Sequence, residues 1–296
     1  MTTLLSLIGE QPMPALLPNR FLRPNHTLLI CTERTEPVAR RISRLIDHSR
    51  IEKTDPYDLT TILARMNDLL PPREEAIVNL TGGTKMMMLA AFALATQRNL
   101  EFVYLESEHA PQRLHRYSFN SGQLLHTSSD RLPSLLTASD YLNAHLPGFT
   151  EEGFSRDDKG NLTIGGRLEQ AVANALANSF EVLTGVRPQG VANQIEIDLV
   201  IRMANQVGIA EVKLGGDGEP PKHGIDQLST AGGRVYLGTY TSKFLITAKR
   251  PASSIRQLAA ERGITLITLS RYEDGFQLEP DDTSRLTRII RERLSN

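Results

Sequence analysis

Two neighbouring apolar runs between Ile195 and Lys213 carry charged residues where a buried strand is normally apolar. The first run contains Asp198, and the second contains Glu211 followed two residues later by Lys213. Because side chains two residues apart on a strand project from the same face, Glu211 and Lys213 are expected to lie side by side. A charge that is buried without a partner is costly. The sequence therefore predicts that these three groups neutralise one another or bind a metal ion or a phosphate.

The size and composition of the chain bound the kinds of protein it can be. Its 296 residues favour two domains over one. The net charge of −1 gives no overall attraction for nucleic acid, so any such binding must be local. A single cysteine, Cys31, excludes an internal disulfide and fits a reducing compartment. No signal sequence and no membrane-spanning apolar run is recognisable, so we expect a cytoplasmic protein without a membrane partner.

Strand and helix patterns alternate through the first half of the chain. Short apolar runs predict strands, and apolar residues at helical spacing predict the helices between them. Strands are expected at 27–31, 75–80 and 101–105, helices at 36–49, 57–70 and 85–96, and a hairpin at 113–119 and 123–127. This alternation predicts an α/β domain in which helices pack on the faces of a parallel sheet.

A shift in composition near residue 150 predicts the boundary between two domains. We expect a first domain at 1–130, a linker at 131–160 that contains a helix at 135–146, and a second domain at 161–296. The second domain is also expected to be α/β. Its elements are expected as a strand at 161–164, a helix at 167–183, paired strands at 193–203 and 207–214, and a later strand–helix alternation that ends in a basic helix at 284–294.

The segment Asn79-Leu80-Thr81-Gly82-Gly83-Thr84-Lys85 leaves a predicted strand and opens a predicted helix. Two glycines let the backbone approach a ligand, and the first amides of the helix lack partners inside the helix. Thr81 and Thr84 add hydroxyl groups, and Lys85 adds a positive charge. Such a turn can bind an anionic phosphodiester or nucleotide at the carboxyl edge of a parallel sheet. The alternative is a structural glycine turn in which Thr84 caps the helix.

This strand–loop–helix motif, within its α/β unit, resembles the CRISPR-associated Rossmann-fold (CARF) sensor domain over roughly residues 1–130. The resemblance implies a homodimer that binds a cyclic oligoadenylate, with cyclic tetra-adenylate expected, across its two-fold axis. The ligand-facing residues that it implies are Thr32, Arg34, Asn79, Thr81, Gly82, Gly83, Thr84 and Lys85, in which Thr32 and Arg34 represent the loop after the first strand.

Hydrolysis of a phosphodiester needs charge neutralisation and an activated water, which carboxylate-held divalent metals and a lysine can supply. An acidic residue, a hairpin-length interval and then Glu-x-Lys resembles the core of the PD-(D/E)xK nucleases. In that resemblance Asp198, Glu211 and the carbonyl of Val212 hold Mg²⁺ or Mn²⁺, which prefer such oxygen ligands. Glu169, Lys213 and Gln227 complete the implied catalytic residues. Glu196 is the alternative to Asp198, because the apolar alternation leaves their facing open.

The two resemblances together are typical of ancillary nucleases of type III CRISPR systems. They imply a cyclic-oligoadenylate-activated, metal-dependent nuclease that cleaves DNA or RNA. One alternative is a ligand-sensing regulator whose second domain binds nucleic acid without cutting it. Another is a ring nuclease in which the first domain degrades the cyclic nucleotide near Thr81, Thr84 and Lys85.

Overall fold

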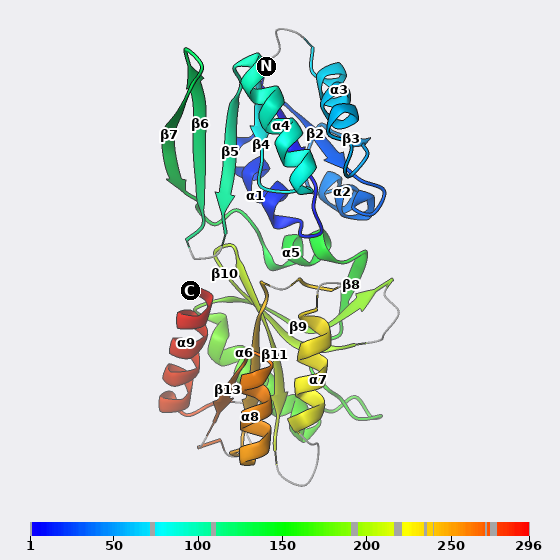
Figure 1. Cartoon of the computed structure of the whole chain (residues 1–296). Helices are drawn as coiled ribbons and strands as arrows, with labels where there is room; N and C mark the ends of the chain where they lie inside the picture. The colour runs from blue at the N-terminus through cyan, green and yellow to red at the C-terminus, as the bar shows by residue number, and fades with distance from the viewer. Residues whose placement is uncertain are drawn as a thin grey trace. The chain divides into compact units, whose positions relative to one another are not determined.

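The computed structural model divides into two compact units, Met1–Leu135 and Leu136–Asn296 (Figure 1). It describes residues 2–71, 75–107, 111–190, 195–215, 221–233, 236–238, 240–269, 271–272 and 277–295. Within these ranges no helix is both long enough and apolar enough to cross a membrane.

The first unit is built on a single sheet whose described strands follow the order β3-β2-β1-β4-β5-β6-β7. Its elements are β1 (Thr2–Leu7), α1 (Met13–Leu22), β2 (His26–Cys31), α2 (Glu36–Ser43), β3 (Ser49–Lys53), α3 (Leu59–Leu69), β4 (Glu75–Asn79), α4 (Lys85–Arg98), β5 (Glu101–Glu106), β6 (Arg113–Asn120) and β7 (Gln123–Arg131). Strands β1 to β5 pair in parallel, and the expected hairpin of β6 and β7 joins them antiparallel.

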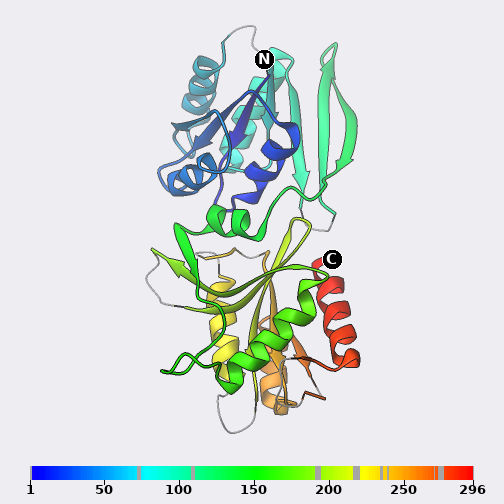
Figure 2. The same cartoon turned by 180° about the vertical axis from the view of Figure 1, so that it is seen from behind.

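Helices cover both faces of this sheet because its buried strands are apolar on both sides. Ile62 of α3 and Met87 of α4 pack with Leu5 and Val78 on one face, which is turned to the viewer in Figure 1. Helices α1 and α2 pack on the opposite face, seen in Figure 2. From β1 the chain adds β2 and β3 on one side, and it then returns to place β4 on the other side of β1. The loops after β1 and β4 are therefore neighbours at the carboxyl edge.

The second unit has a mixed sheet with the described strand order β13-β12-β11-β10-β9-β8. Its elements are α5 (Ala138–His145), β8 (Gly148–Glu151), α6 (Ile164–Ala177), β9 (Glu181–Gln189), β10 (Ile197–Met203), β11 (Gln206–Lys213), α7 (Pro221–Ala231), β12 (Ser242–Thr247), α8 (Ser253–Glu261), β13 (Ile264–Thr268) and α9 (Pro280–Ser295). Strands β8 to β11 are antiparallel neighbours, and β12 and β13 add in parallel.

Helices α6 and α9 bury their apolar sides against one face of this sheet. Leu168 and Val172 of α6 join Leu199, Val212 and other core residues there. Helix α7 packs against β11 and β12. Because neighbouring residues on a strand face opposite ways, Asp198 and Glu211 project from the face opposite Leu199 and Val212, toward α7.

The observed elements differ from the sequence predictions in several places. The strand expected at 161–164 is wrong, because Thr163 caps α6 by accepting a 2.9 Å hydrogen bond from the amide of Gly166. The helix expected at 167–183 ends at Ala177, and its last residues belong to β9. The helix expected at 36–49 ends at Ser43. Residues 193 and 194 of the strand expected at 193–203 lie outside the described residues.

Most of the segment expected as a linker at 131–160 is folded into the second unit. Helix α5 begins at Ala138 with a capping box formed by Thr137 and Asp140. Strand β8 then pairs with β9, so this segment extends the second sheet. Residues 148–151 therefore belong to the second domain and not to a linker, because their backbone hydrogen bonds are made within its sheet.

Candidate functional site

The glycine turn after β4 lies directly against the end of β1. A β-carbon placed on Gly82 would lie 2.1 Å from the carbonyl oxygen of Leu7, and one placed on Gly9 would lie 3.3 Å from the amide nitrogen of Gly83. Gly83 itself has a φ of 78°, which disfavours any other residue. The close backbone contact between the two loops therefore requires glycine at Gly82. This contact lies at the base of the candidate ligand site.

The side chain of Asn79 is buried behind this loop and is bonded to the protein itself. Its side-chain nitrogen donates to Ser6 Oγ at 3.0 Å and to the carbonyl of Pro14 at 2.8 Å. Its side-chain oxygen accepts from the amide and the hydroxyl of Thr81, at 3.1 and 2.7 Å. These four bonds use the full capacity of a primary amide. Asn79 is fully buried, so it holds β1, α1 and the loop together.

The two threonine hydroxyls of the loop also have structural partners. Thr81 Oγ1 accepts from the amide of Leu105 at 2.8 Å while it donates to Asn79. Thr84 caps α4 through the amide of Met87 at 3.2 Å and donates to the carbonyl of Pro56 at 2.7 Å. Lys85 is different, because it is exposed at the first position of α4. The groups of this loop that suit an anion are therefore its backbone amides and one lysine.

The prediction that Thr32 and Arg34 form the loop after the first strand is wrong. They follow β2, because β1 at Thr2–Leu7 precedes it and was not predicted. Thr32 is buried and exchanges hydrogen bonds with Thr35. Arg34 is exposed and pairs with Glu10, which lies in the true loop after β1. The residues that sequence analysis missed here are Gly9 and Glu10.

The three charged residues of the opening motif come together in the second unit. The amide of Val212 donates to Asp198 Oδ2 at 2.7 Å. Lys213 Nζ lies 3.2 Å from Glu211 Oε2 and 3.7 Å from Asp198 Oδ2. Leu199 pairs with Ala210 across the antiparallel ladder, so the preceding Asp198 faces Glu211. The backbone register therefore places both carboxylates and the ammonium group at one point.

Asp198 and Glu196 lie in different surroundings. Glu196 pairs with Arg187 at 2.6 Å on the surface. Asp198 is 8% exposed and Glu211 is 1% exposed. Only Asp198 therefore shares the buried charged cluster with Glu211 and Lys213.

Burial sets the protonation behaviour of this cluster. It raises the pKa of Asp198 to about 6, an effect that the charge of Lys213 opposes and the charge of Glu169 increases. Burial, followed by the charge of Asp198, raises the pKa of Glu211 well above its ordinary value. Two carboxylates that are buried together resist double ionisation unless a cation compensates them. One lysine supplies one positive charge, which leaves the ionised cluster with a net negative charge.

Helix α7 closes over the cluster at a glycine. A β-carbon on Gly224 would lie 3.5 Å from Glu211 Cβ and 3.7 Å from Lys213 Cε. Gln227 lies about one turn further along α7, and its Oε1 is 3.1 Å from His223 Nδ1. The structure thus brings α7 to the cluster through Gly224, whereas the described contact of Gln227 is with His223.

Glu169 enters from α6 and is held by a preceding loop. Its Oε2 accepts from the amide of Ser155 at 3.0 Å, and its Oε1 accepts from the Ser155 hydroxyl at 2.8 Å. Gly166 permits this approach, because a β-carbon there would lie 2.1 Å from the Ser155 carbonyl oxygen. Sequence analysis missed Ser155, because no local pattern predicts a contact between residues fourteen positions apart.

The charged cluster fits a hard divalent cation held by few side chains. Among the described residues, no group of three or more histidine, cysteine, aspartate or glutamate side chains is arranged to hold a metal ion. Asp198 and Glu211 provide two carboxylates, and the main chain of Val212 between Glu211 and Lys213 provides a carbonyl. Glu211 Oε2 is buried and has Lys213 Nζ 3.2 Å away. Buried carboxylate oxygens of this kind are the hard ligands that Mg²⁺ or Mn²⁺ prefers.

The two sites can be compared with known proteins. Residues 3–127 match the family model of the Card1 CARF domain. This match confirms the predicted sensor-domain fold for the first unit. A search among curated proteins found no match to the chain.

Solved structures extend the likeness beyond the CARF domain. Can2 from Sulfobacillus thermosulfidooxidans, solved in complex with cyclic tetra-adenylate, matches with a TM-score of 0.76 and 16% identity, and the alignment covers 100% of both chains. Protein VC1899 from Vibrio cholerae also matches over 100% of both chains, with a TM-score of 0.70 and 12% identity. At these identities the likeness establishes a shared fold, and it confirms the predicted architecture of two α/β domains.

A third structure shares the arrangement over part of its length. A type III CRISPR defence DNA nuclease activated by cyclic oligoadenylate matches with a TM-score of 0.63 and 15% identity. The alignment covers 97% of this chain and 51% of that chain. The predicted resemblance to CRISPR ancillary nucleases is thereby confirmed at the level of the fold.

Proposed function

We propose that this chain is a cyclic-oligoadenylate-activated, metal-dependent nuclease of type III CRISPR defence. The observation that carries the proposal is the buried cluster of Asp198, Glu211 and Lys213. It lies in the second domain of a chain that shares its whole fold with Can2. A structural ion pair alone does not require two buried carboxylates against one lysine.

The activator is proposed to be cyclic tetra-adenylate, bound to a homodimer at the loops after β1 and β4. The backbone amides of Gly82 and Gly83, with Lys85 at the start of α4, supply positive potential for phosphodiester groups. Asn79, Thr81 and Thr84 fix the loop through the hydrogen bonds described above. Support for this ligand comes from the Card1 CARF match and from Can2, which was solved with cyclic tetra-adenylate.

In the second domain the chain's own residues organise phosphodiester hydrolysis. Asp198, Glu211 and the carbonyl of Val212 would hold Mg²⁺ or Mn²⁺, which when bound would neutralise charge on the phosphoryl group. Lys213 lies between the two carboxylates and is proposed to orient the attacking water. Glu169 acts through its negative charge on Asp198 while Ser155 fixes its carboxylate. The substrate is DNA or RNA.

The test is a cleavage assay on supercoiled plasmid, single-stranded DNA and RNA, each with Mn²⁺ or Mg²⁺ and a panel of cyclic oligoadenylates. We expect cleavage that requires both the metal and one ring size. Chromatography of the activator in the same reactions detects the ring-nuclease alternative as linear products. Tight nucleic-acid binding without cleavage under every condition would favour the regulator alternative and contradict the proposal.

A further inference from the structure

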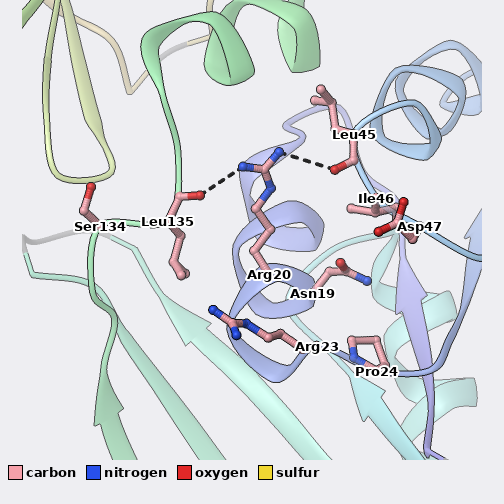
Figure 3. A pocket seen from close by; sticks show the side chains of 9 residues that line it. All are labelled: Asn19, Arg20, Arg23, Pro24, Leu45, Ile46, Asp47, Ser134 and Leu135. Atoms are coloured by element: carbon pink, nitrogen blue, oxygen red, sulfur yellow. Dashed lines mark hydrogen bonds between the residues drawn. The ribbon is translucent and has the colours of Figure 1, made fainter.

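The first unit contains a cavity of about 560 Å³, and Figure 3 shows the side chains that line it. Its walls come from the end of α1, the connection between α2 and β3, and the final residues Ser134 and Leu135 of the unit. The first two segments precede β2 and β3, so the cavity lies at the amino edge of the parallel strands. The loops after β1 and β4 lie at the opposite, carboxyl edge.

Arg20 joins the three walls of this cavity. Its Nη1 donates to the carbonyl of Leu135 at 3.1 Å, and its Nη2 donates to the carbonyl of Leu45 at 3.3 Å. Figure 3 shows the guanidinium extended between these two oxygens. Because these contacts connect α1, the residues after α2 and the end of the unit, the cavity is a formed feature of the fold.

Two further charged residues line the cavity and differ from Arg20. Arg23 closes α1 in the left-handed conformation with a φ of 50°, and its side chain is exposed. Asp47 lies on the wall formed by the residues after α2. Within the described part of the chain, no hydrogen bond or ion pair is formed by the guanidinium of Arg23 or the carboxylate of Asp47. An arginine and an aspartate therefore line the same cavity without pairing with each other.

Two further arginines lie close to the cavity along the chain. Burial, and then the charge of Arg44 after α2, lowers the pKa of Arg41, which lies one turn before Leu45. Basic residues at helix C-termini often serve only to complement the helix dipole. That role applies to Arg44 and also to Arg23 at the end of α1, but it does not account for the unpaired carboxylate of Asp47 in the same cavity.

We propose that this cavity binds a phosphorylated small molecule with free hydroxyl groups, of about the size of a mononucleotide. A planar guanidinium matches two phosphate oxygens, so Arg23 would bind the phosphate. Asp47 would accept hydrogen bonds from hydroxyl groups, as an acidic residue does for ribose in many nucleotide sites. The cavity volume lies within the range of roughly 300 to 1,000 Å³ that is typical of small-molecule sites. The bound ligand would contact Ser134 and Leu135, where the chain leaves this unit.

The test is isothermal titration of the full chain with adenosine monophosphate, ribose 5-phosphate, inorganic phosphate and adenosine. Adenosine monophosphate and ribose 5-phosphate are expected to show saturable binding. Inorganic phosphate is expected to bind more weakly, and adenosine is expected to show no measurable binding. Arg23→Gln is expected to weaken the binding of adenosine monophosphate and ribose 5-phosphate about tenfold or more, because a charged hydrogen-bond donor to the phosphate is lost. Asp47→Asn should weaken ribose 5-phosphate but leave inorganic phosphate unchanged.

Two controls separate this cavity from other anion sites. Arg44→Gln removes a nearby exposed charge outside the cavity lining and should leave binding unchanged. Lys85→Gln alters the glycine-loop site and should also leave ligand binding in the cavity unchanged. Melting temperatures of all variants without ligand are expected to match that of the parent chain. Absence of saturable binding by every compound would overturn the proposal, as would binding that Lys85→Gln abolishes and Arg23→Gln preserves.

Discussion

Both carboxylate oxygens of Glu169 accept a hydrogen bond from Ser155, one from its amide and one from its hydroxyl. The two residues lie on α6 and on the loop before it, and Glu169 is only 6% exposed. The contact fixes the carboxylate, so its negative charge acts on Asp198 from a constant position.

We predict that Ser155→Ala lowers nuclease activity by on the order of tenfold, because one of two charge-assisted hydrogen bonds is lost. Ser155→Thr, which keeps the hydroxyl group, should restore most of the activity. The measurement is the initial rate of cleavage, with Ser254→Ala on the exposed side of α8 as a control. Equal rates for Ser155→Ala and the parent chain, at full activator and metal, would show that Ser155 does not position Glu169.

A second prediction concerns stability without metal. The pKa of Asp198 is raised to about 6 in the folded chain, chiefly by burial. The folded state therefore binds this proton more tightly than the unfolded state does. The resulting stability is fully present below the unfolded pKa of about 4 and is lost as the pH rises through about 6. Asp198→Asn, which cannot ionise, should be more stable than the parent chain at about pH 8 in EDTA, by on the order of 2 kcal/mol.

Denaturant unfolding at several pH values measures this effect. Glu196→Gln is the matched control, because Glu196 lies two residues before Asp198, just ahead of β10, but pairs with Arg187 at the surface. It should unfold with the pH dependence of the parent chain. A loss of stability in Asp198→Asn across the whole pH range would contradict the assignment of a costly buried charge.

A third prediction tests the glycine loop. Lys85 is exposed at the first position of α4, so Lys85→Gln should leave the melting temperature unchanged. It should weaken cyclic tetra-adenylate binding about tenfold, because one charge near a phosphodiester is lost. Gly82→Ala should abolish binding and also destabilise the chain, since its β-carbon would overlap Leu7. Titration calorimetry distinguishes the two variants, and unchanged affinity in Lys85→Gln would place the anion elsewhere.

A fourth prediction uses the single cysteine. Burial raises the pKa of Cys31, on β2, to about 11. Only a small fraction is therefore thiolate at about pH 8, and access to the buried sulfur is restricted. Alkylation by iodoacetamide is expected to be more than about 100-fold slower in the native chain than in denaturant. Rapid native labelling, followed by mass spectrometry, would show that the first sheet opens readily around β2.

The charged cluster was predictable because its physical signal is local. Asp198, Glu211 and Lys213 stand in apolar strands, and strand geometry alone brings Glu211 and Lys213 to one face. The glycine turn at Gly82 was predictable for a similar reason, since a strand–glycine–helix pattern leaves few alternatives. The roles of Asn79 and Thr81 were less predictable, because their partners Ser6 and Leu105 are distant in sequence.

The missed elements lacked a distinctive pattern. Strand β1 has the sequence Thr-Thr-Leu-Leu-Ser-Leu, in which apolar residues follow neither strand nor helix spacing, so periodicity does not identify it. Helix α1 contains Pro18, which normally argues against a helix interior. Strand β9 includes Gly185 and Pro188, residues typical of turns, yet Gly185 lets the strand pass against the backbone of Gly153. In each case tertiary contacts decided the local structure.

The most direct test of the proposed nuclease compares Glu211→Gln with Glu196→Gln in one cleavage assay. Both substitutions remove one carboxylate charge, but only Glu211 belongs to the buried cluster with Lys213. With Mn²⁺ and cyclic tetra-adenylate, we predict that Glu196→Gln cleaves at the parent rate and that Glu211→Gln loses about 100-fold or more. Cleavage by Glu211→Gln at the parent rate would contradict the assignment of this cluster as the catalytic site.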